Sequence, residues 1–223
     1  MDARQHFVVL GIIAVAFVIF LGQESSEDGY RSYCTVPEQV VAAWHTTIGD
    51  GLNAESARSF ATLLTATLLH GGFQHVLMNM LFLWVFGSMA SRHLGVWWPL
   101  PVFVFTGIIG SIVHVLLNRE SSIPTLGASG AVCGFEGLYL GLALQWRMAW
   151  PDVWPIARPI PPLQLAALAV VGFAFDIYGI ASQGHGVAFG AHIGGLLAGL
   201  FIAAVLTTIY PTEAAFRRSR LAG

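Results

Sequence analysis

Long apolar segments recur from one end of this sequence to the other, and they restrict its fold more than any other feature. A helix needs roughly 20 apolar residues to cross the ~30 Å hydrocarbon core of a bilayer. Six segments approach that length, at residues 7–22, 75–90, 96–117, 128–146, 163–181 and 187–210. Charged residues make up 10% of the chain, against roughly 25% in a soluble domain. We therefore predict an all-α, polytopic membrane protein with a bundle of six transmembrane helices.

The connections between these spans indicate a single membrane domain over the whole chain, residues 1–223. Neither an internal repeat nor a second, soluble domain is visible. The one long connection, 23–74, includes the apolar run 60–69, and loops of this length are usually functional or partly helical. We expect it outside the membrane, with short helices at the outer interface. The first segment is also typical of a signal sequence, but no small-x-small cleavage site follows it, so we expect a retained span.

Arginine residues predict the orientation, because basic residues are retained on the cytoplasmic side of a membrane. With six spans, both termini share one side with the second and fourth connections. That side has seven arginines, which are Arg4, Arg92, Arg147, Arg158, Arg217, Arg218 and Arg220. The opposite side has three, Arg31, Arg58 and Arg119, together with most of the acidic residues. We therefore expect both termini in the cytoplasm.

The composition also excludes several classes of function. The chain has no lysine and a net charge of −2, so it lacks the basic surface that nucleic-acid phosphates require. Its two cysteines, Cys34 and Cys133, lie in a polar loop and in an apolar segment. They provide neither a disulfide framework nor a set of zinc ligands. We expect no nucleic-acid partner, no metal and no cofactor.

Polar residues within the spans are the candidates for function, because ionisable groups are costly in lipid. These candidates are His75, Asn79, His114, Ser129, Glu136, Asp176 and His192. Ser129 lies in the sequence Gly-Ala-Ser-Gly, residues 127–130, at the start of the fourth span. Free backbone N–H groups and the positive end of the helix dipole suit an oxyanion there. A lone serine at such a position is more often a helix cap or a small packing residue.

Small residues on the fourth and sixth spans predict that Ser129 and His192 lie close together. In the fourth span they recur every four residues on one helix face, at Ser129, Cys133, Gly137 and Gly141. The sixth span has the matching GxxxG pattern Gly195 and Gly199, which begins three residues after His192. Contact between the two faces would bring His192 near Ser129, as a nucleophile and its general base require. No carboxylate is placed to orient His192, so the sequence favours a Ser-His dyad over a triad.

His75 and Asn79 form a second candidate pair near the start of the second span. They are four residues apart and therefore share one face of a helix. Both donate hydrogen bonds without a fixed negative charge, as an oxyanion site needs. The alternative is that they hydrogen-bond to other helices and hold the bundle together.

Three motifs in this order resemble the rhomboid family of intramembrane serine proteases. They are His70-Gly71-Gly72-Phe73-Gln74-His75-x-x-x-Asn79, Gly127-Ala128-Ser129-Gly130 and Ala191-His192-x-x-Gly195-x-x-x-Gly199, each at the start of a span. The resemblance covers residues 65–209 in the six-span form of the family. It implies that Ser129 is the nucleophile, that His192 is its general base, and that His75 and Asn79 stabilise the oxyanion with the Ser129 backbone N–H. His70 matches a further histidine of the family motif, for which we expect a structural role.

The family resemblance implies an intramembrane endopeptidase in the lipid bilayer, with single-pass membrane proteins as substrates. We expect a prokaryotic inner membrane as its location. We also expect a polar cavity a short way below the outer surface, with the glycine-rich loop 176–190 as a movable cover. His114 is expected to bond to a neighbouring helix, and Asp176 to cap the end of the fifth span.

The sequence departs from the family pattern at several points. Cys133 stands where members usually have an aromatic residue packed against the catalytic histidine, and the Trp-Arg pair of the first loop is absent. Glu136, seven residues after Ser129, is expected to be protonated and hydrogen-bonded. Two other functions therefore remain open: an inactive rhomboid-like protein that binds or escorts membrane clients, and a small-solute transporter. A transporter would use a proton path through Glu136, His114 and Asp176.

Overall fold

The computed structural model describes residues 6–24, 30–146 and 187–221, together with Met148 and isolated residues between 161 and 178. Within these residues the chain is helical, and its only β-type pairing is an isolated bridge between Thr35 and Thr125. The long helices are α1 (Phe7–Glu24), α4 (Phe73–Leu94), α5 (Pro99–Leu117), α6 (Ser129–Gln145) and α8 (Phe189–Ile209). The shorter helices are α2 (Pro37–Asp50), α3 (Ala54–Thr65) and α9 (Glu213–Leu221), with 3₁₀ turns at Arg31–Tyr33 and Ala66–Leu68. The predicted all-α class is confirmed.

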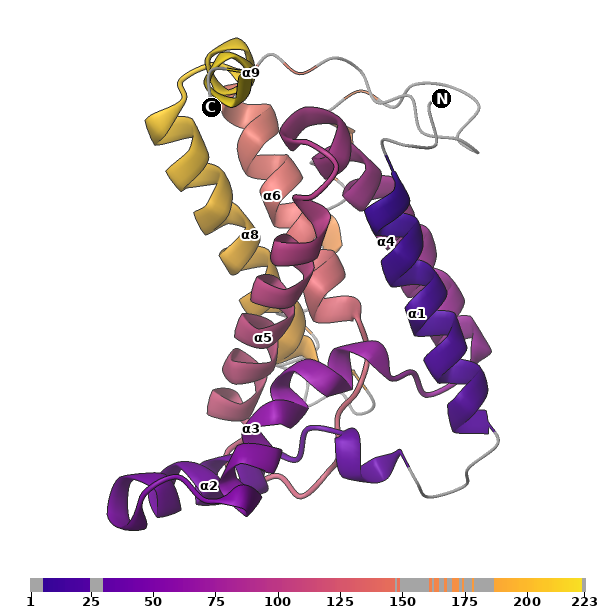
Figure 1. Cartoon of the computed structure of the whole chain (residues 1–223), viewed down its shortest axis with the longest axis vertical. Helices are drawn as coiled ribbons and strands as arrows, with labels where there is room; N and C mark the ends of the chain where they lie inside the picture. The colour runs from indigo at the N-terminus through magenta and orange to yellow at the C-terminus, as the bar shows by residue number, and fades with distance from the viewer. Residues whose placement is uncertain are drawn as a thin grey trace.

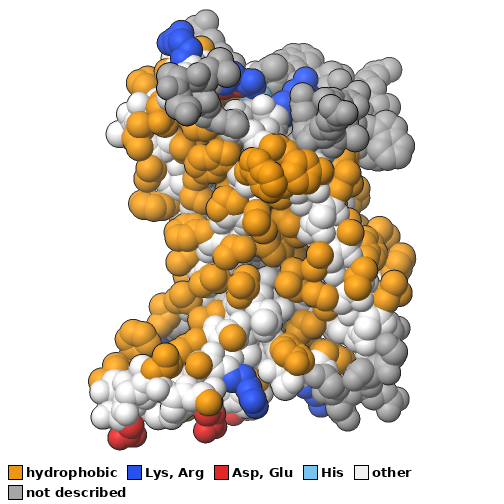
Figure 2. Space-filling model, viewed as in Figure 1, with side chains coloured by type: hydrophobic (Ala, Val, Ile, Leu, Met, Phe, Trp, Pro, Cys, Tyr) orange, Lys and Arg blue, Asp and Glu red, His pale blue; other side chains and the backbone are white. Residues whose placement is uncertain are grey.

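The long helices coincide with five of the six predicted spans. By length and composition, α4, α5 and α8 can cross a membrane, whereas the apolar part of α1, Phe7–Gln23, is shorter. Helix α6 has 17 residues. More than half of the span predicted at 163–181, and of the cover predicted at 176–190, lies outside the described residues. Figure 2 shows apolar side chains over the middle of the molecule, as a lipid-facing surface requires.

Helix α6 is the centre of the bundle. It contacts α4, α5 and α8, and its contact with α8 is the most extensive between described helices. Helix α1 packs along α4 on the other side of the molecule, while α2 and α3 lie at one end and α9 at the other (Figure 1). The loop predicted at 23–74 is thus partly helical, as expected.

Glycines bring the backbones of α6 and α8 together. A Cβ atom at Gly195 would fall on the carbonyl oxygen of Gly130, and one at Gly199 would fall on that of Gly134. The predicted face of α6 does lie against α8, because Cβ atoms at Gly137 and Gly141 would fall on Leu196 and Ala203 of that helix. The contacts of the two GxxxG glycines themselves are with the carbonyl groups of Gly130 and Gly134, each one residue after a predicted position.

The region of α2 and α3, residues 35–66, is hydrogen-bonded to the segment that leads into α6. Thr35 and Thr125 exchange two backbone hydrogen bonds of 3.0 and 2.8 Å, and the Thr35 hydroxyl donates to the Thr62 carbonyl in α3 at 2.9 Å. The Gly127 N–H donates to the Ala66 carbonyl at 2.9 Å. Because these bonds hold Thr125 and Gly127, just before Ser129, the long first connection supports the start of α6.

Helix α9 docks on the opposite end of the bundle through one aromatic side chain. Phe216 is buried among three rings, with centroid distances of 6.1 Å to Trp98, 5.8 Å to Trp146 and 5.2 Å to Tyr210. The Trp146 indole N–H donates to the Tyr210 carbonyl at 2.9 Å, which satisfies its only polar group.

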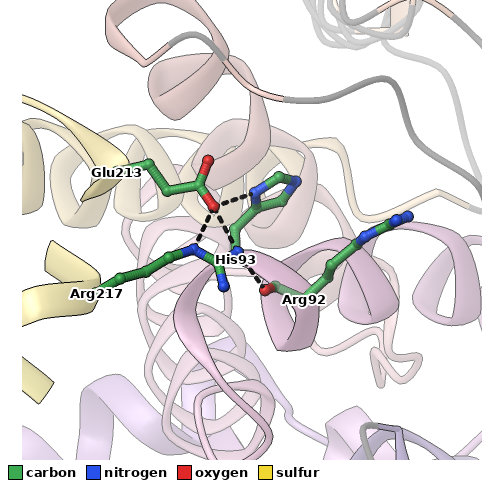
Figure 3. A network of polar contacts seen from close by, with 4 residues as sticks. All are labelled: Arg92, His93, Glu213 and Arg217. Atoms are coloured by element: carbon green, nitrogen blue, oxygen red, sulfur yellow. Dashed lines mark hydrogen bonds and ion pairs between the residues drawn. The ribbon is translucent and has the colours of Figure 1, made fainter. Parts of the chain in front are cut away.

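A carboxylate joins α9 to α4, as Figure 3 shows. Glu213 Oε1 accepts hydrogen bonds from Arg217 Nε at 2.8 Å and Nη2 at 2.6 Å, and it lies 3.1 Å from His93 Nδ1. Arg217 Nη2 also donates to the Arg92 carbonyl at 3.1 Å. Burial raises the pKa of Glu213, but the hydrogen bonds from Arg217 and His93 outweigh it and hold that pKa below its usual range.

We expect the docking of α9 to weaken in acid. A carboxylate with a lowered pKa stabilises the fold fully above its unfolded-state pKa of about 4.3, and this stabilisation is lost as the pH falls through the folded-state value. Hydrogen-exchange protection of the α9 amides should therefore decrease below about pH 4.3. In the variant Glu213→Gln, the α9 amides should be less protected at neutral pH than in the wild type. Their protection should not decrease further as the pH falls below about 4.3. Equal protection of wild-type α9 on both sides of the window would contradict this assignment.

Candidate active site

Ser129 and His192 meet at the beginnings of two packed helices. Ser129 is the first residue of α6, and His192 lies in the first turn of α8. The distance from Ser129 Oγ to His192 Nε2 is 2.9 Å, and both side chains are half-buried. A neutral imidazole that accepts this hydroxyl proton is the arrangement that activates a serine for attack on a carbonyl.

Close backbone packing of the neighbouring residues holds Ser129 and His192 near each other. A Cβ atom at Gly130, next to Ser129, would lie 3.1 Å from the carbonyl oxygen of Ala191, next to His192. Helix α5 also approaches here, since a Cβ atom at Gly110 would lie 2.7 Å from the same oxygen. The ring of Phe189 contacts His192 edge-on, with centroids 6.4 Å apart. An aromatic side chain therefore touches the histidine from its own helix, which sequence reasoning missed because it sought one at position 133.

His75 has a defined donor atom. Its Nδ1 accepts a hydrogen bond of 3.3 Å from the Gly71 backbone N–H. In a neutral imidazole the proton must then lie on Nε2, which makes Nε2 a donor. This nitrogen faces the turn before Ser129, because a Cβ atom at Gly127 would lie 2.8 Å from it.

Asn79 faces the same turn from one helical turn further along α4. Its side chain is 8% exposed, and its Nδ2 atom has no hydrogen-bond partner among the described residues. Nδ2 would lie 3.8 Å from a Cβ atom at Gly127. A buried amide without a partner is unfavourable by about 1–3 kcal/mol, so Asn79 is poised to donate to an oxygen that arrives at this turn.

Gly127 is the residue that leaves room for both donors. Its φ of +129° favours glycine, and His75 already occupies the space of a Cβ atom. The first turn of α6 adds backbone N–H groups that have no partner within the helix. The donors and the open turn thus surround a position next to Ser129 Oγ where an oxyanion can be held.

A small polar cavity lies beside Ser129. Its volume is about 20 Å³, enough for one or two water molecules. Six of its lining residues have a hydroxyl group or an imidazole, namely Thr35, Thr67, Ser111, His114, Thr125 and Ser129, and the others are small or apolar residues such as Ala66 and Leu126. The threonines were not among the residues selected from the sequence, since all three lie outside the predicted spans. Among the described residues, His114 Nδ1 lies 3.4 Å from Asn118 Nδ2 in the next turn of the chain, and its expected bond to a neighbouring helix stays a prediction.

Cys133 and Glu136, also singled out in the sequence, do not line this cavity. Cys133 and Glu136 are half-buried on α6, and Asp176 lies outside the described residues. Within the described part of the chain, no three His, Cys, Asp or Glu side chains are grouped so that they could hold a metal ion.

One known protein family matches most of this chain. A family model described as the Rhomboid domain matches residues 57–209, more than half of the sequence. Rhomboid protease GluP of Bacillus subtilis is 34% identical over 145 residues, which are 65% of this chain and 25% of GluP. YdcA of the same bacterium is 32% identical over 142 residues, 63% of this chain and 65% of YdcA.

A plant protein gives a similar match. RHOMBOID-like protein 5 of Arabidopsis thaliana is 30% identical over 145 residues, 65% of this chain and 43% of that protein. The matched regions thus span between a quarter and about two thirds of these relatives. The residues matched by the family model, 57–209, include the helices that position Ser129, His192, His75 and Asn79.

Proposed function

The chain belongs to the rhomboid family, and we propose that it is an intramembrane serine protease that works through a Ser129–His192 dyad. The observation that carries the proposal is the 2.9 Å contact between Ser129 Oγ and His192 Nε2. That contact lies beside an open turn faced by His75 and Asn79. Rhomboid relatives named as proteases support the same reaction class.

Acylation begins when Ser129 Oγ attacks the carbonyl carbon of the scissile peptide bond. His192 Nε2 takes the hydroxyl proton as the C–O bond forms. The carbonyl oxygen becomes negatively charged and accepts hydrogen bonds from His75 Nε2–H, Asn79 Nδ2–H and backbone N–H groups at the start of α6. The tetrahedral intermediate then collapses, the C–N bond breaks, and His192 gives the proton to the departing amine.

Deacylation reverses these roles with water. His192 takes a proton from a water molecule, whose oxygen attacks the acyl carbon of the Ser129 ester. Collapse of the second intermediate releases the carboxylic acid product and returns the proton to Ser129 Oγ. The polar cavity beside Ser129 is a local source of this water within an otherwise apolar bundle.

We extend the proposal to substrates and location. The substrates are single-pass membrane proteins with helix-weakening residues near the cleaved bond, because a helical peptide bond is shielded from attack. The domain comprises residues 1–223 in a prokaryotic inner membrane, with both termini in the cytoplasm. The site then lies near the outer surface, since α9, which includes Arg217, is at the end of the bundle opposite α2 and α3 (Figure 1).

Reconstitution tests the proposed function directly. The purified protein is placed in liposomes with a single-pass model substrate that has a glycine-rich outer segment. We expect two membrane-derived fragments whose new termini mass spectrometry can assign. A protein that only binds or escorts clients would retain the substrate and leave it intact, which would refute the protease assignment.

Removal of either oxyanion donor should slow turnover without weakening substrate binding. We expect His75→Ala and Asn79→Ala each to lower kcat by about 10²–10³-fold, because each donor acts on charge that exists only in the transition state. KM should change little. Initial rates in liposomes over a range of substrate densities measure both constants, and an equal loss in binding would instead assign the pair to interhelical packing.

A further inference from the structure

We propose that Gln23, at the end of α1, is a positioning residue for the oxyanion site and acts through the loop that orients His75. The inference rests on the proposed protease function and names a further component of the same site. It concerns a helix that contributes none of the groups described in the active site.

The side-chain amide of Gln23 forms hydrogen bonds with both backbone groups of His70, its carbonyl and its N–H. Its Nε2 donates to the His70 carbonyl at 3.2 Å, and its Oε1 accepts from the His70 N–H at 3.1 Å. Gln23 is 8% exposed and His70 is 2% exposed. Because both hydrogen bonds are buried, neither backbone group of His70 can exchange its partner for water without cost.

The position of His70 determines the position of the next residue. Gly71 supplies the N–H that His75 Nδ1 accepts at 3.3 Å. The His70 ring also packs edge-on against the His75 ring, with centroids 5.2 Å apart. Burial, with a smaller effect of His75, lowers the pKa of His70 to about 4, so the two rings meet without charge repulsion at neutral pH.

These contacts form a continuous chain from the first helix to the donor atom. Gln23 fixes the His70 backbone, the adjacent Gly71 N–H fixes His75 Nδ1, and the ring geometry then directs Nε2–H toward the turn at Gly127. Catalysis depends on donor placement to within about 1 Å. Loss of the Gln23 bonds should therefore reduce the rate of the chemical step and leave substrate binding largely unchanged.

The test variant is Gln23→Leu in the full-length protein, which keeps the side-chain size and removes both hydrogen bonds. The matched control is Gln39→Leu, since Gln39 is exposed on α2. We expect Gln23→Leu to lower kcat about 10- to 100-fold with KM nearly unchanged. We expect Gln39→Leu to have wild-type constants.

A double-mutant cycle separates positioning from general stability. If Gln23 acts through His75, Gln23→Leu should lower kcat in the wild type but have little further effect in the His75→Ala background. An equal fold-loss in both backgrounds, or an unchanged kcat in Gln23→Leu, would overturn the proposal. If Gln23→Leu fails to fold, Gln23→Glu replaces it, because a carboxylate keeps the acceptor for the His70 N–H and loses the donor to the His70 carbonyl.

A spectroscopic measurement keeps this inference distinct from the protease assignment. The ¹⁵N resonance of His75 Nδ1 in histidine-labelled protein reports whether that nitrogen accepts a hydrogen bond. It should shift in Gln23→Leu and not in Gln39→Leu, whether or not the protein cleaves a substrate. An unchanged resonance would overturn the role of Gln23, whereas an inactive wild type with the expected shift would refute only the protease assignment.

Discussion

Ser129→Ala is expected to abolish proteolysis, because the alanine side chain has no oxygen to attack the peptide carbonyl. Loss of the nucleophile or of its general base lowers kcat by about 10⁴–10⁶ in serine proteases. His192→Ala should therefore cause a loss of similar size, since Ser129 Oγ and His192 Nε2 are joined by a 2.9 Å contact. Cleavage of a single-pass substrate in liposomes measures both losses.

The same two variants should act as a unit. The double variant Ser129→Ala/His192→Ala is expected to be no slower than either single variant, because residues that act in one step give non-additive losses. Ser59→Ala, at a half-buried serine of α3 far from the dyad in sequence, is the matched control and should retain full activity. Wild-type cleavage by Ser129→Ala would remove Ser129 as the nucleophile.

Gly195→Ala is expected to be the most destabilising single-methyl substitution in the bundle. The added Cβ would fall on the Gly130 carbonyl oxygen, a backbone atom that cannot rotate away. Overpacked cores lose about 1–3 kcal/mol even where side chains can adjust, so we expect a loss of about 3 kcal/mol or more here. Any protein that still folds should also lose the Ser129–His192 contact, because Gly130 directly follows Ser129.

Thermal unfolding in detergent, followed by the loss of helical circular dichroism, measures this effect. Gly11→Ala is the matched control, because a Cβ at that position of α1 has no neighbour within 4 Å. It should leave the unfolding temperature unchanged or raise it slightly, since alanine favours a helix over glycine by roughly 0.5–1 kcal/mol. An unfolding temperature equal to that of the control would show that backbone contact at Gly195 does not limit how closely α6 and α8 approach.

The sequence was most informative where one physical constraint dominates. Lipid requires long apolar helices, so the described spans agree with the predicted ones to within a few residues. Close helix packing requires small residues, so the GxxxG pattern at Gly195 and Gly199 correctly indicated a partner in the fourth span. That contact alone predicts that His192 lies near Ser129.

Features that depend on rotation of a helix or on distant backbone atoms could not be predicted in the same way. The predicted row of α6 does meet α8 at Gly137 and Gly141, but the GxxxG glycines contact the carbonyl groups of Gly130 and Gly134, which the small-residue pattern does not single out. Neighbouring residues on a helix differ by about 100°, and a run rich in small residues does not select one row. The aromatic contact of His192 is also not predicted. The family pattern points to position 133, whereas the ring belongs to Phe189, one turn before the histidine.

Polar contacts over long sequence separations were the least predictable. The sequence predicts Gln23 only as the first residue of the polar connection after the first span, and nothing in its neighbours indicates a partner at His70, 47 residues later. Thr35 and Thr125 are 90 residues apart and looked like ordinary loop residues. In each contact one partner, Gln23 or Thr35, lies outside residues 57–209, the range that the family model matches.

Reaction of the purified protein with a fluorophosphonate probe tests the central claim most directly, because it requires an activated serine and no knowledge of the substrate. The wild type should be labelled in detergent, and peptide mapping should place the label on Ser129. Folded Ser129→Ala and His192→Ala variants should remain unlabelled, while Ser59→Ala should react like the wild type. A folded wild type that does not react, or a label that persists in Ser129→Ala, would contradict the Ser129–His192 dyad.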